Sequence, residues 1–323
     1  MAVTQKQIAE KLGVSITLVS RVLLGKAEEI GIAPATIKRV EKAAQEMGYV
    51  RNAAALTLRG KPAYTIGVVV YNFDDLFLSS LIKQIQIQAH KHGYSILLVG
   101  FLNRVPDEQD LSPLHKHAID GLIILGSDLK AAWLNSFNHI PTARIGQGPS
   151  GEDSAKIILD EDDAAKKLMT YLAARKRKKV AILSNDHPAA RMRQKALEGA
   201  AKAAGLKSVV VLSKEADYFN AGIDAATRGL QKHPDIDAFA CNTYRIAAGA
   251  AHVLSERGIN VSEDISVTGI GNILSTTSVD PNITTISTPV EEMVEHAFQV
   301  ILAPAPSSSQ LCRIPGKLII RDA

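Results

Sequence analysis

Apolar residues recur at helical spacing near the beginning of the chain and predict three short helices within residues 1–48. The first helix follows Thr4, whose hydroxyl can accept a hydrogen bond from a free backbone N–H, and Gln7 stands where a capping-box partner is found. Gly13 is expected to end this helix, because a helix stop often needs a residue that tolerates positive φ.

Two further helices follow the same pattern. Ser15 is expected to cap the second helix, which runs to Leu24. Pro34 stands at the start of the third helix, where its missing N–H leaves no hydrogen bond unmade, and Gly48 ends that helix. The positions predicted to face a shared core are Ile8, Ala9, Leu12, Leu18, Val19, Val22, Ile37, Val40, Ala44 and Met47.

From Thr65 onward, apolar runs of strand length alternate with helical stretches. Such runs between helices are typical of a parallel, doubly wound sheet. The predicted strands cover residues 66–70, 95–99, 121–125, 180–183, 208–212, 238–241 and 265–269. A single lobe needs fewer strands, so we expect an α/β body of two lobes that face each other across a cleft. Ligands of such sheets bind at the carboxyl ends of the strands.

Composition is that of an ordinary globular protein. Of 323 residues, 46% are hydrophobic and 22% are charged, which argues against a disordered chain. No apolar run approaches the roughly 18 residues of a membrane span, and the N-terminus lacks the apolar segment of a signal peptide. Cys241 and Cys312 fit no metal-ligand spacing, so we expect a reduced, cytoplasmic protein.

The net charge of +4 is unevenly distributed along the chain. Residues 1–61 contain ten basic and five acidic side chains, a balance of +5, which leaves −1 for the other 262 residues. A basic segment joined to a nearly neutral body indicates binding to a polyanion.

The first two predicted helices, joined through Gly13, have the layout of a helix-turn-helix. In that motif the second helix lies in the major groove and presents its N-terminal side chains to base edges. Ile16, Thr17 and Arg21 lie off the predicted core face of this helix. Arginine can bond guanine with two hydrogen bonds, threonine can bond several bases, and isoleucine can contact a thymine methyl group. A plain helical hairpin is the alternative interpretation, and the charge of the segment favours DNA binding.

Residues 3–61 resemble the DNA-binding headpiece of the lactose/galactose repressor (LacI/GalR) family. The headpiece resemblance rests on Val14-Ser15, Val19-Ser20-Arg21-Val22, Gly48-Tyr49, and Asn52-Ala53-Ala54-Ala55 with Leu58. It extends over nearly the whole chain through residues 119–123, 263–267, 283–286 and 318–322. The chain departs from the family in a longer loop at residues 25–32 and in Arg51, where proline is frequent.

The resemblance implies a helix-turn-helix headpiece over residues 1–48, a hinge helix or linker over 49–61, and an effector-binding and dimerisation body over 62–323. The implied body has the two-lobed, doubly wound α/β fold of periplasmic binding proteins. Its N-terminal lobe is expected over about 62–160 and 291–318, and its C-terminal lobe over about 161–290 and 319–323.

The resemblance also implies a homodimer on a pseudo-palindromic DNA operator. Ile16, Thr17 and Arg21 fall where the family contacts bases in the major groove. Leu58 falls where paired hinge helices insert a leucine into a minor-groove step, and such an apolar wedge kinks the duplex. The other residues assigned to DNA contact are Thr4, Ser15, Ser20, Asn52 and Ala55.

A small-molecule effector is the second implied partner. The resemblance assigns the family's effector arginine to Arg193 and an aromatic that stacks on sugar to Tyr218. The full set assigned to effector binding is Asn72, Asp74, Asn103, Arg193, Tyr218, Thr243 and Asn272. Tyr244 and Gly271 replace two acids that commonly bind sugar hydroxyls. A sugar or sugar phosphate is favoured, and a nucleoside, another metabolite or no effector are the alternatives.

Two basic features have competing interpretations. Arg144 interrupts an apolar strand and either reaches an anionic effector or pairs with a carboxylate, and we favour the pair. The basic run at residues 175–179 ends a predicted helix, where cations are favoured, so we interpret it as a solvated face rather than a second nucleic-acid site.

The sequence favours a DNA-binding transcriptional regulator, most simply a repressor. Its expected partners are operator DNA, an effector and a second copy of the chain, with no membrane. No Ser/His/Asp, Cys/His or metal-ligand arrangement can be argued, so we expect no enzymatic activity, no cofactor and no metal. A sugar-binding module without DNA function and an α/β enzyme are the alternatives.

Overall fold

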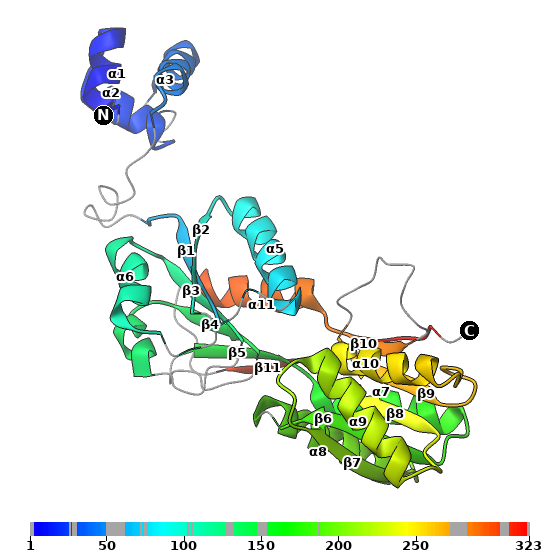
Figure 1. Ribbon diagram of the computed structural model, residues 1–323. Helices are drawn as coiled ribbons and strands as arrows, with labels where there is room; N and C mark the ends of the chain where they lie inside the picture. The colour runs from blue at the N-terminus through cyan, green and yellow to red at the C-terminus, as the bar shows by residue number, and fades with distance from the viewer. Residues whose placement is uncertain are drawn as a thin grey trace. The chain divides into compact units, whose positions relative to one another are not determined.

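The chain forms two compact units, residues 1–61 and residues 62–323 (Figure 1). The computed structural model describes residues 3–25, 27, 31–49, 62–71, 73, 76–101, 104, 106–126, 132–146, 154–186, 188–271, 283–303 and 310–321. Across these ranges, no helix combines the length and apolar character needed to cross a membrane.

The first unit, the headpiece, is a bundle of three helices drawn in blue in Figure 1. Ile8, Val19 and Val40 are fully buried at its centre, one from each helix. The helices are α1 (Gln5–Leu12), α2 (Ile16–Leu23) and α3 (Pro34–Glu46). All three predicted helices are therefore confirmed, and each contributes its predicted apolar face to the core.

Local sequence sets the helix ends of the headpiece as predicted. Thr4 Oγ1 accepts a hydrogen bond from the N–H of Gln7 at 3.3 Å, and Gln7 Oε1 accepts one from the N–H of Thr4 at 2.8 Å, which completes a capping box. Ser15 Oγ accepts a hydrogen bond from the N–H of Leu18 at 3.1 Å at the start of α2. Gly13 ends α1 with a φ of 66°, in the left-handed region that favours glycine.

The N-terminal lobe of the second unit is built on a six-stranded parallel sheet with strand order β11-β5-β4-β3-β1-β2. Helices α5 and α11 cover one face, whereas α6 and the 3-10 helix η2 cover the other. The strands are β1 (Thr65–Val70), β2 (Ser95–Gly100), β3 (Gly121–Leu125), β4 (Thr142–Ile145), β5 (Ser154–Leu159) and β11 (Leu311–Ile314). The helices are α5 (Leu76–Lys91), α6 (Glu108–Lys116), η2 (Ala132–Phe137) and α11 (Val290–Ile301).

The C-terminal lobe has a second six-stranded sheet with strand order β12-β10-β9-β8-β6-β7, and β12 is its single antiparallel strand. Helices α9 and α10 cover one face, and α7 and α8 cover the other. The strands are β6 (Lys179–Asn185), β7 (Lys207–Ser213), β8 (Ala238–Cys241), β9 (Ser266–Ile270), β10 (Thr284–Ser287) and β12 (Lys317–Ile319). The helices are α7 (Glu161–Ala174), α8 (Pro188–Ala203), α9 (Tyr218–Lys232) and α10 (Tyr244–Glu256). The predicted two-lobed, doubly wound α/β fold is confirmed.

Three segments join the two sheets, because β5 leads to α7, β10 leads to α11 and β11 leads to β12. Gly316 lies in the third segment, and a Cβ there would collide with Ile286 Cγ2 and lie 2.9 Å from the carbonyl oxygen of Ser287. Its own carbonyl accepts a hydrogen bond from Lys167 Nζ at 2.7 Å. β12 already begins at Lys317, slightly before residue 319, where the C-terminal lobe was expected to resume.

The basic run at residues 175–179 exposes Arg175, Lys176 and Lys178, in agreement with a solvated face, and two of its arginines also form structural hydrogen bonds. Arg177 donates hydrogen bonds to the carbonyl of Asp264 and to Ser266 Oγ, both at 2.9 Å. Arg175 donates to the carbonyl of Ser262 at 2.9 Å. These side chains therefore fasten the loop before β9 to the end of α7, because arginine offers several donors in a fixed planar geometry.

Candidate nucleic-acid interface and effector site

One face of helix α2 is buried, and the opposite face exposes both polar and apolar side chains to solvent. Ile16 is 48% exposed, and Thr17 and Arg21 are also exposed, whereas Val19 and Val22 are buried. Arg21 forms no ion pair with any residue that the structure describes. The three side chains predicted to contact bases thus lie on the accessible side of one helix.

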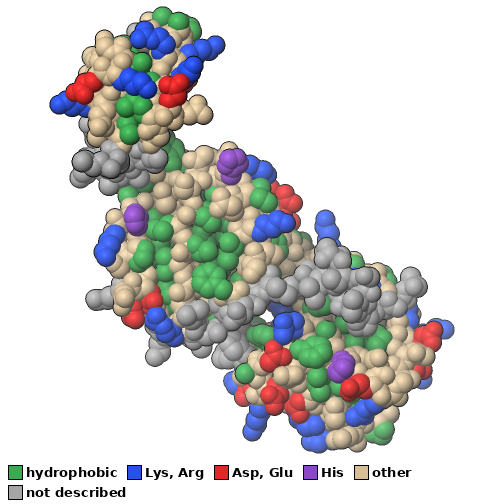
Figure 2. All heavy atoms as spheres, turned by 45° about the horizontal axis from the view of Figure 1, so that its top comes forward, with side chains coloured by type: hydrophobic (Ala, Val, Ile, Leu, Met, Phe, Trp, Pro, Cys, Tyr) green, Lys and Arg blue, Asp and Glu red, His purple; other side chains and the backbone are tan. Residues whose placement is uncertain are grey.

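Basic and acidic side chains lie together on the visible face of the headpiece (Figure 2). Ion pairs join Lys6 to Glu10 at 3.9 Å and Lys11 to Glu46 at 3.7 Å. All four side chains are about half exposed or more. Exposed pairs of this kind contribute at most about 1 kcal/mol, so these lysines remain available to other anions.

The predicted phosphate contacts Thr4 and Ser15 also cap their helices. Each hydroxyl oxygen accepts a backbone hydrogen bond; the O–H of Thr4 also donates to Gln7 Oε1 at 3.2 Å, whereas Ser15 keeps its O–H as a donor. Both lie at helix N-termini, where the helix dipole favours negative charge. Ser20 is half-buried on α2. Asn52, Ala55 and Leu58 lie outside the described residues.

Arg193 on α8 is held by three short hydrogen bonds at the carboxyl end of the second sheet. Its Nε and Nη2 donate to the two oxygens of Glu161, each at 2.6 Å, and its Nη1 donates to the carbonyl oxygen of Asn242 at 2.6 Å. The exposed fraction of the side chain is 23% for Arg193 and 9% for Glu161. Burial lowers the pKa of Arg193, but the charge and hydrogen bonds of Glu161 outweigh burial and raise that pKa above its ordinary value. The arginine therefore stays positively charged.

Tyr218 and Thr243, the other described residues assigned to the effector, begin two neighbouring helices. Tyr218 is the half-buried first residue of α9, close enough to Arg193 to raise the pKa of that guanidinium. Thr243 precedes α10, and its Oγ1 accepts a hydrogen bond from the N–H of Ile246 at 3.2 Å. Arg193 and Tyr218 are therefore close to each other, and Thr243 follows the residue that Arg193 contacts.

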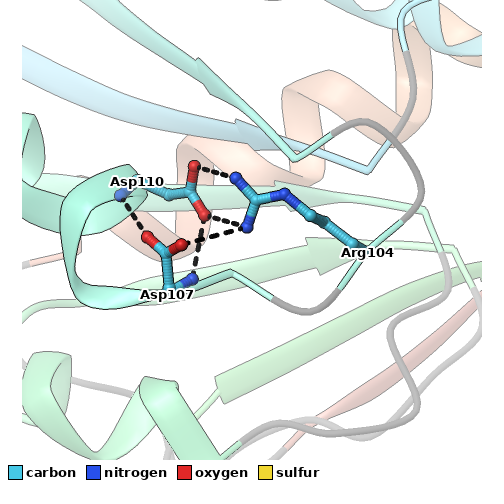
Figure 3. A network of polar contacts seen from close by, with 3 residues as sticks. All are labelled: Arg104, Asp107 and Asp110. Carbon is cyan, nitrogen blue, oxygen red and sulfur yellow. Dashed lines mark hydrogen bonds and ion pairs between the residues drawn. The ribbon is translucent and has the colours of Figure 1, made fainter.

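Arg104 joins two acidic side chains at the start of α6 in a network of charged groups (Figure 3). Arg104 donates from Nη1 and Nη2 to the two oxygens of Asp110, both at 2.6 Å, and its Nη1 lies 3.4 Å from Asp107. Hydrogen bonds from Arg104 lower the pKa of Asp110. Asn103 precedes this network, but Asn103, Asn72, Asp74 and Asn272 all lie outside the described residues.

Two residues singled out by the sequence lie in the interior. Arg144 is fully buried on β4, and its Nη1 donates to the carbonyl oxygen of Gly126 at 3.0 Å. Tyr244, which replaces an acid of the resembled family, is 1% exposed within the core formed with α9 and α10. The guanidinium carbon of Arg321 lies 6.0 Å from the centre of its ring, a cation–π distance.

A groove of about 630 Å³ lies between α7 and α8. Small residues of α8 line it, together with the charged side chains of Lys166, Lys195 and Arg313. Glu161 also lines this groove, but Arg193, Tyr218 and Thr243 do not. The groove therefore adjoins the pair of Glu161 and Arg193 through Glu161, without being lined by the three predicted effector residues.

Comparisons with known proteins identify both units. Residues 4–52 match the family described as "Bacterial regulatory proteins, lacI family". Residues 63–321, most of the chain, match "Periplasmic binding proteins and sugar binding domain of LacI family". The chain belongs to the LacI family. It is therefore a DNA-binding transcriptional regulator, as the sequence predicted.

This LacI-family chain is 28% identical over 309 residues to the HTH-type transcriptional repressor PurR of Vibrio atlanticus (strain LGP32). The match covers 93% of this chain and 91% of the relative. It is 28% identical over 307 residues to the HTH-type transcriptional repressor CytR of Escherichia coli (strain K12), and this match covers 93% of the chain and 89% of the relative. Among solved structures, the lac repressor dimer bound to operator and the anti-inducer ONPF has a TM-score of 0.83 at 22% identity. This match covers 100% of the chain and 99% of the lac repressor chain. The complex of the transcriptional regulator CelR with cellobiose has a TM-score of 0.67 at 20% identity, covering 99% of each chain.

Sequence reasoning missed two residues that contact Arg193. Glu161 was interpreted only as an acid that favours the helix dipole, and Asn242 was not singled out. Asn242 follows a predicted strand directly, and polar residues at that place face ligands in doubly wound sheets. No comparable pattern connects Glu161 with Arg193, because their pairing depends on how α7 packs against α8.

Proposed function

We propose that this protein is a transcriptional repressor that binds a pseudo-palindromic operator as a homodimer and is controlled by a small-molecule effector. The observation that carries the proposal is the exposed face of α2, with Ile16, Thr17 and Arg21, on a headpiece of net charge +5. A charged, solvent-facing helix of this kind suits the major groove. The proposal places the protein with DNA in the cytoplasm and assigns no catalysis to it.

Base contacts and phosphate contacts have separate roles in this proposal. Ile16, Thr17 and Arg21 select the sequence through base edges, whereas Thr4, Ser15 and Ser20 fix the headpiece on the phosphates. Asn52 and Ala55 extend the contact through the hinge, and Leu58 enters a minor-groove step. Two copies of the chain then recognise the two halves of one operator, since a two-fold symmetric dimer matches a pseudo-palindrome.

Effector control is proposed for the body of residues 62–323. Asn72, Asp74, Asn103, Arg193, Tyr218, Thr243 and Asn272 are the residues assigned to the effector. The family description of this region names a sugar-binding domain, and the relatives with solved structures include complexes with cellobiose, lactose and ribose. An effector changes operator affinity only through its different affinities for the DNA-binding and DNA-free states.

Selection of bound duplexes from a random library tests the proposal. The full-length protein is expected to enrich a pseudo-palindromic sequence and to bind it with two chains per duplex. Specific binding is expected to exceed nonspecific binding by about 10³-fold or more at physiological salt. Enrichment of no sequence, with or without a panel of sugars and sugar phosphates, would contradict the regulator assignment.

A further inference from the structure

The groove between α7 and α8 has the size of a site for a small organic molecule. Its volume of about 630 Å³ lies within the roughly 300–1,000 Å³ that is typical of ligand pockets. Met192, which is 48% exposed, contributes a large apolar side chain to it. The rest of the α8 side is lined by small residues, which allow a flat apolar group to approach the helix backbone: Ala196, Gly199, Ala200, Ala203 and Ala204.

Gly199 widens this groove without any packing requirement. Apart from its own helix, a Cβ at this position would meet no heavy atom within 4 Å, and the backbone there does not need positive φ. Glycine inside a helix lowers helix stability relative to alanine. The described part of the protein therefore gives no packing reason for a glycine here, whereas a ligand lying against α8 gives one.

Two lysines of the groove carry charges that no acid balances. Lys166 on α7 and Lys195 on α8 are exposed, and their ammonium groups have no partner among the residues that the structure describes. Glu161 lines the same groove, but both of its carboxylate oxygens accept hydrogen bonds from Arg193 at 2.6 Å. The two lysines therefore leave an excess of positive charge in the groove.

Arg313 brings a third cation to the groove from the other lobe. It lies on β11 of the N-terminal lobe, whereas α7 and α8 belong to the C-terminal lobe. Its Nη1 is 3.8 Å from Asp162, and the two side chains are 45% and 80% exposed, so this pair is weak. A ligand in the groove therefore contacts both lobes of the body.

We propose that this groove binds an organic phosphate monoester, with the phosphate at Lys166 and Lys195 and the apolar part of the ligand against α8. A phosphate monoester carries about 1.5 to 2 negative charges at neutral pH, which matches the two unbalanced lysines. Lysine suits such a group, because its ammonium is a compact charge on a flexible stem and can reach any of the phosphate oxygens. The site is additional to the residues assigned to the effector, and it does not depend on operator binding.

1-Naphthyl phosphate is the probe, because it joins a phosphate monoester to a flat apolar ring system. Its binding to the full-length protein is measured by isothermal titration calorimetry, beside inorganic phosphate and 1-naphthol. The probe is expected to bind one site per chain, about tenfold or more tighter than either part, since charge and apolar area both contribute. Absence of saturable binding up to about 5 mM, or equal affinity for inorganic phosphate, would overturn the proposal.

A charge variant tests the role of the two lysines. The double variant Lys166→Gln/Lys195→Gln is expected to bind the probe about tenfold or more weakly than wild type, because both charge-assisted contacts are lost. Lys202→Gln is the matched control, since Lys202 is exposed on α8 but does not line the groove, and its affinity is expected to stay within about twofold of wild type. The headpiece is the same in all variants, so its own anion binding contributes equally. Equal affinities of wild type and the double variant would overturn the proposal.

Gly199→Leu tests the groove without changing any charge. The new side chain meets open space and leucine favours a helix, so the melting temperature is expected to be no lower than that of wild type. The leucine occupies the groove, so affinity for the probe is expected to fall about tenfold or more. Lys202→Leu places the same side chain elsewhere on α8 and is expected to bind within about twofold of wild type. Probe binding that is unchanged in Gly199→Leu would place the ligand outside the groove and overturn the proposal.

Discussion

Two arginines assigned to binding, Arg21 in the headpiece and Arg193 in the body, have opposite surroundings. Arg21 is exposed on α2 and has no ion-pair partner among the described residues. Arg193 is 23% exposed and donates three hydrogen bonds, two of them to Glu161. The same side chain therefore brings a full positive charge to one site and a balanced pair to the other.

The difference matches the chemistry proposed for each site. An operator is a polyanion, and an unpaired arginine gains both from its phosphates and from the acceptor edge of guanine. A neutral sugar offers hydroxyl groups, for which oriented donors matter more than net charge. We therefore propose that the surroundings of each arginine suit it to the partner proposed for its unit.

The largest expected effect is on the stability of the body. Arg193→Met leaves Glu161 buried without its partner, so we expect the free energy of unfolding to fall by about 3 kcal/mol. Urea unfolding is followed by the fluorescence of Trp133, the single tryptophan, which reports on the body, and by helical circular dichroism, to which both units contribute. Arg21→Met is the control, with an expected change within about 0.5 kcal/mol. Equal losses in the two variants would remove the contrast between the two arginines.

The next effect is on operator affinity. Arg21→Ala is expected to weaken binding by about 1–3 kcal/mol and to relax the sequence preference, because a base contact is lost. Lys61→Ala, which removes a basic side chain next to the body, is expected to weaken binding to all sequences alike. Fluorescence anisotropy with the selected operator and a scrambled duplex measures both. The same pattern in the two variants would contradict a base-reading role for Arg21.

A smaller effect separates the stability of the two units. Ser15→Ala removes the side-chain cap of α2, at an expected cost of about 1 kcal/mol to the headpiece. Amide hydrogen exchange in α2 is expected to become faster by a matching factor, whereas the Trp133 transition stays where it is. A shift of that transition would show that the headpiece and the body unfold as one cooperative unit.

The smallest expected effect is the dependence of body stability on acidic pH through Asp224. Hydrogen bonds from Arg228 and Ser213 lower the pKa of Asp224 below its ordinary value of 3.8. The carboxylate therefore stabilises the body fully above that value, and the contribution is lost as pH falls through the lowered pKa. Asp224→Asn is expected to cost less than about 1 kcal/mol at neutral pH, since the pair is about one-third exposed. The urea midpoints of wild type and Asp224→Asn, followed by Trp133 fluorescence, are expected to differ at about pH 6 and to differ less at about pH 3. An equal difference at both pH values would contradict the assignment.

Local sequence predicted much of this fold because local chemistry determines it. The capping box of Thr4 and Gln7, the left-handed Gly13 and the first-turn Pro34 each set a helix end within a few residues. The seven predicted strands, β1 to β3 and β6 to β9, read as apolar runs because helices cover both faces of each sheet, whereas β5 and β10 to β12 were not predicted as strands. The exposed face of α2 follows from its helical spacing alone.

Contacts between distant segments could not be predicted in the same way. Glu161 and Arg193 are 32 residues apart and meet only because α7 packs beside α8. Arg177 contacts a loop more than 80 residues away, so its place at the end of α7 suggested solvent instead. The resemblance indicated an effector arginine, but it carried no information about the carboxylate that balances it.

Operator affinity of the full-length protein as a function of salt tests the account most directly. Affinities for the selected operator and for a scrambled duplex are both expected to fall steeply with salt, because the basic headpiece displaces counterions from the phosphates. The affinity for the operator is expected to exceed the affinity for the scrambled duplex by about 10³-fold or more at physiological salt. Coinciding curves for the two duplexes, or affinities that do not respond to salt, would contradict the assignment of α2 as a sequence-reading helix.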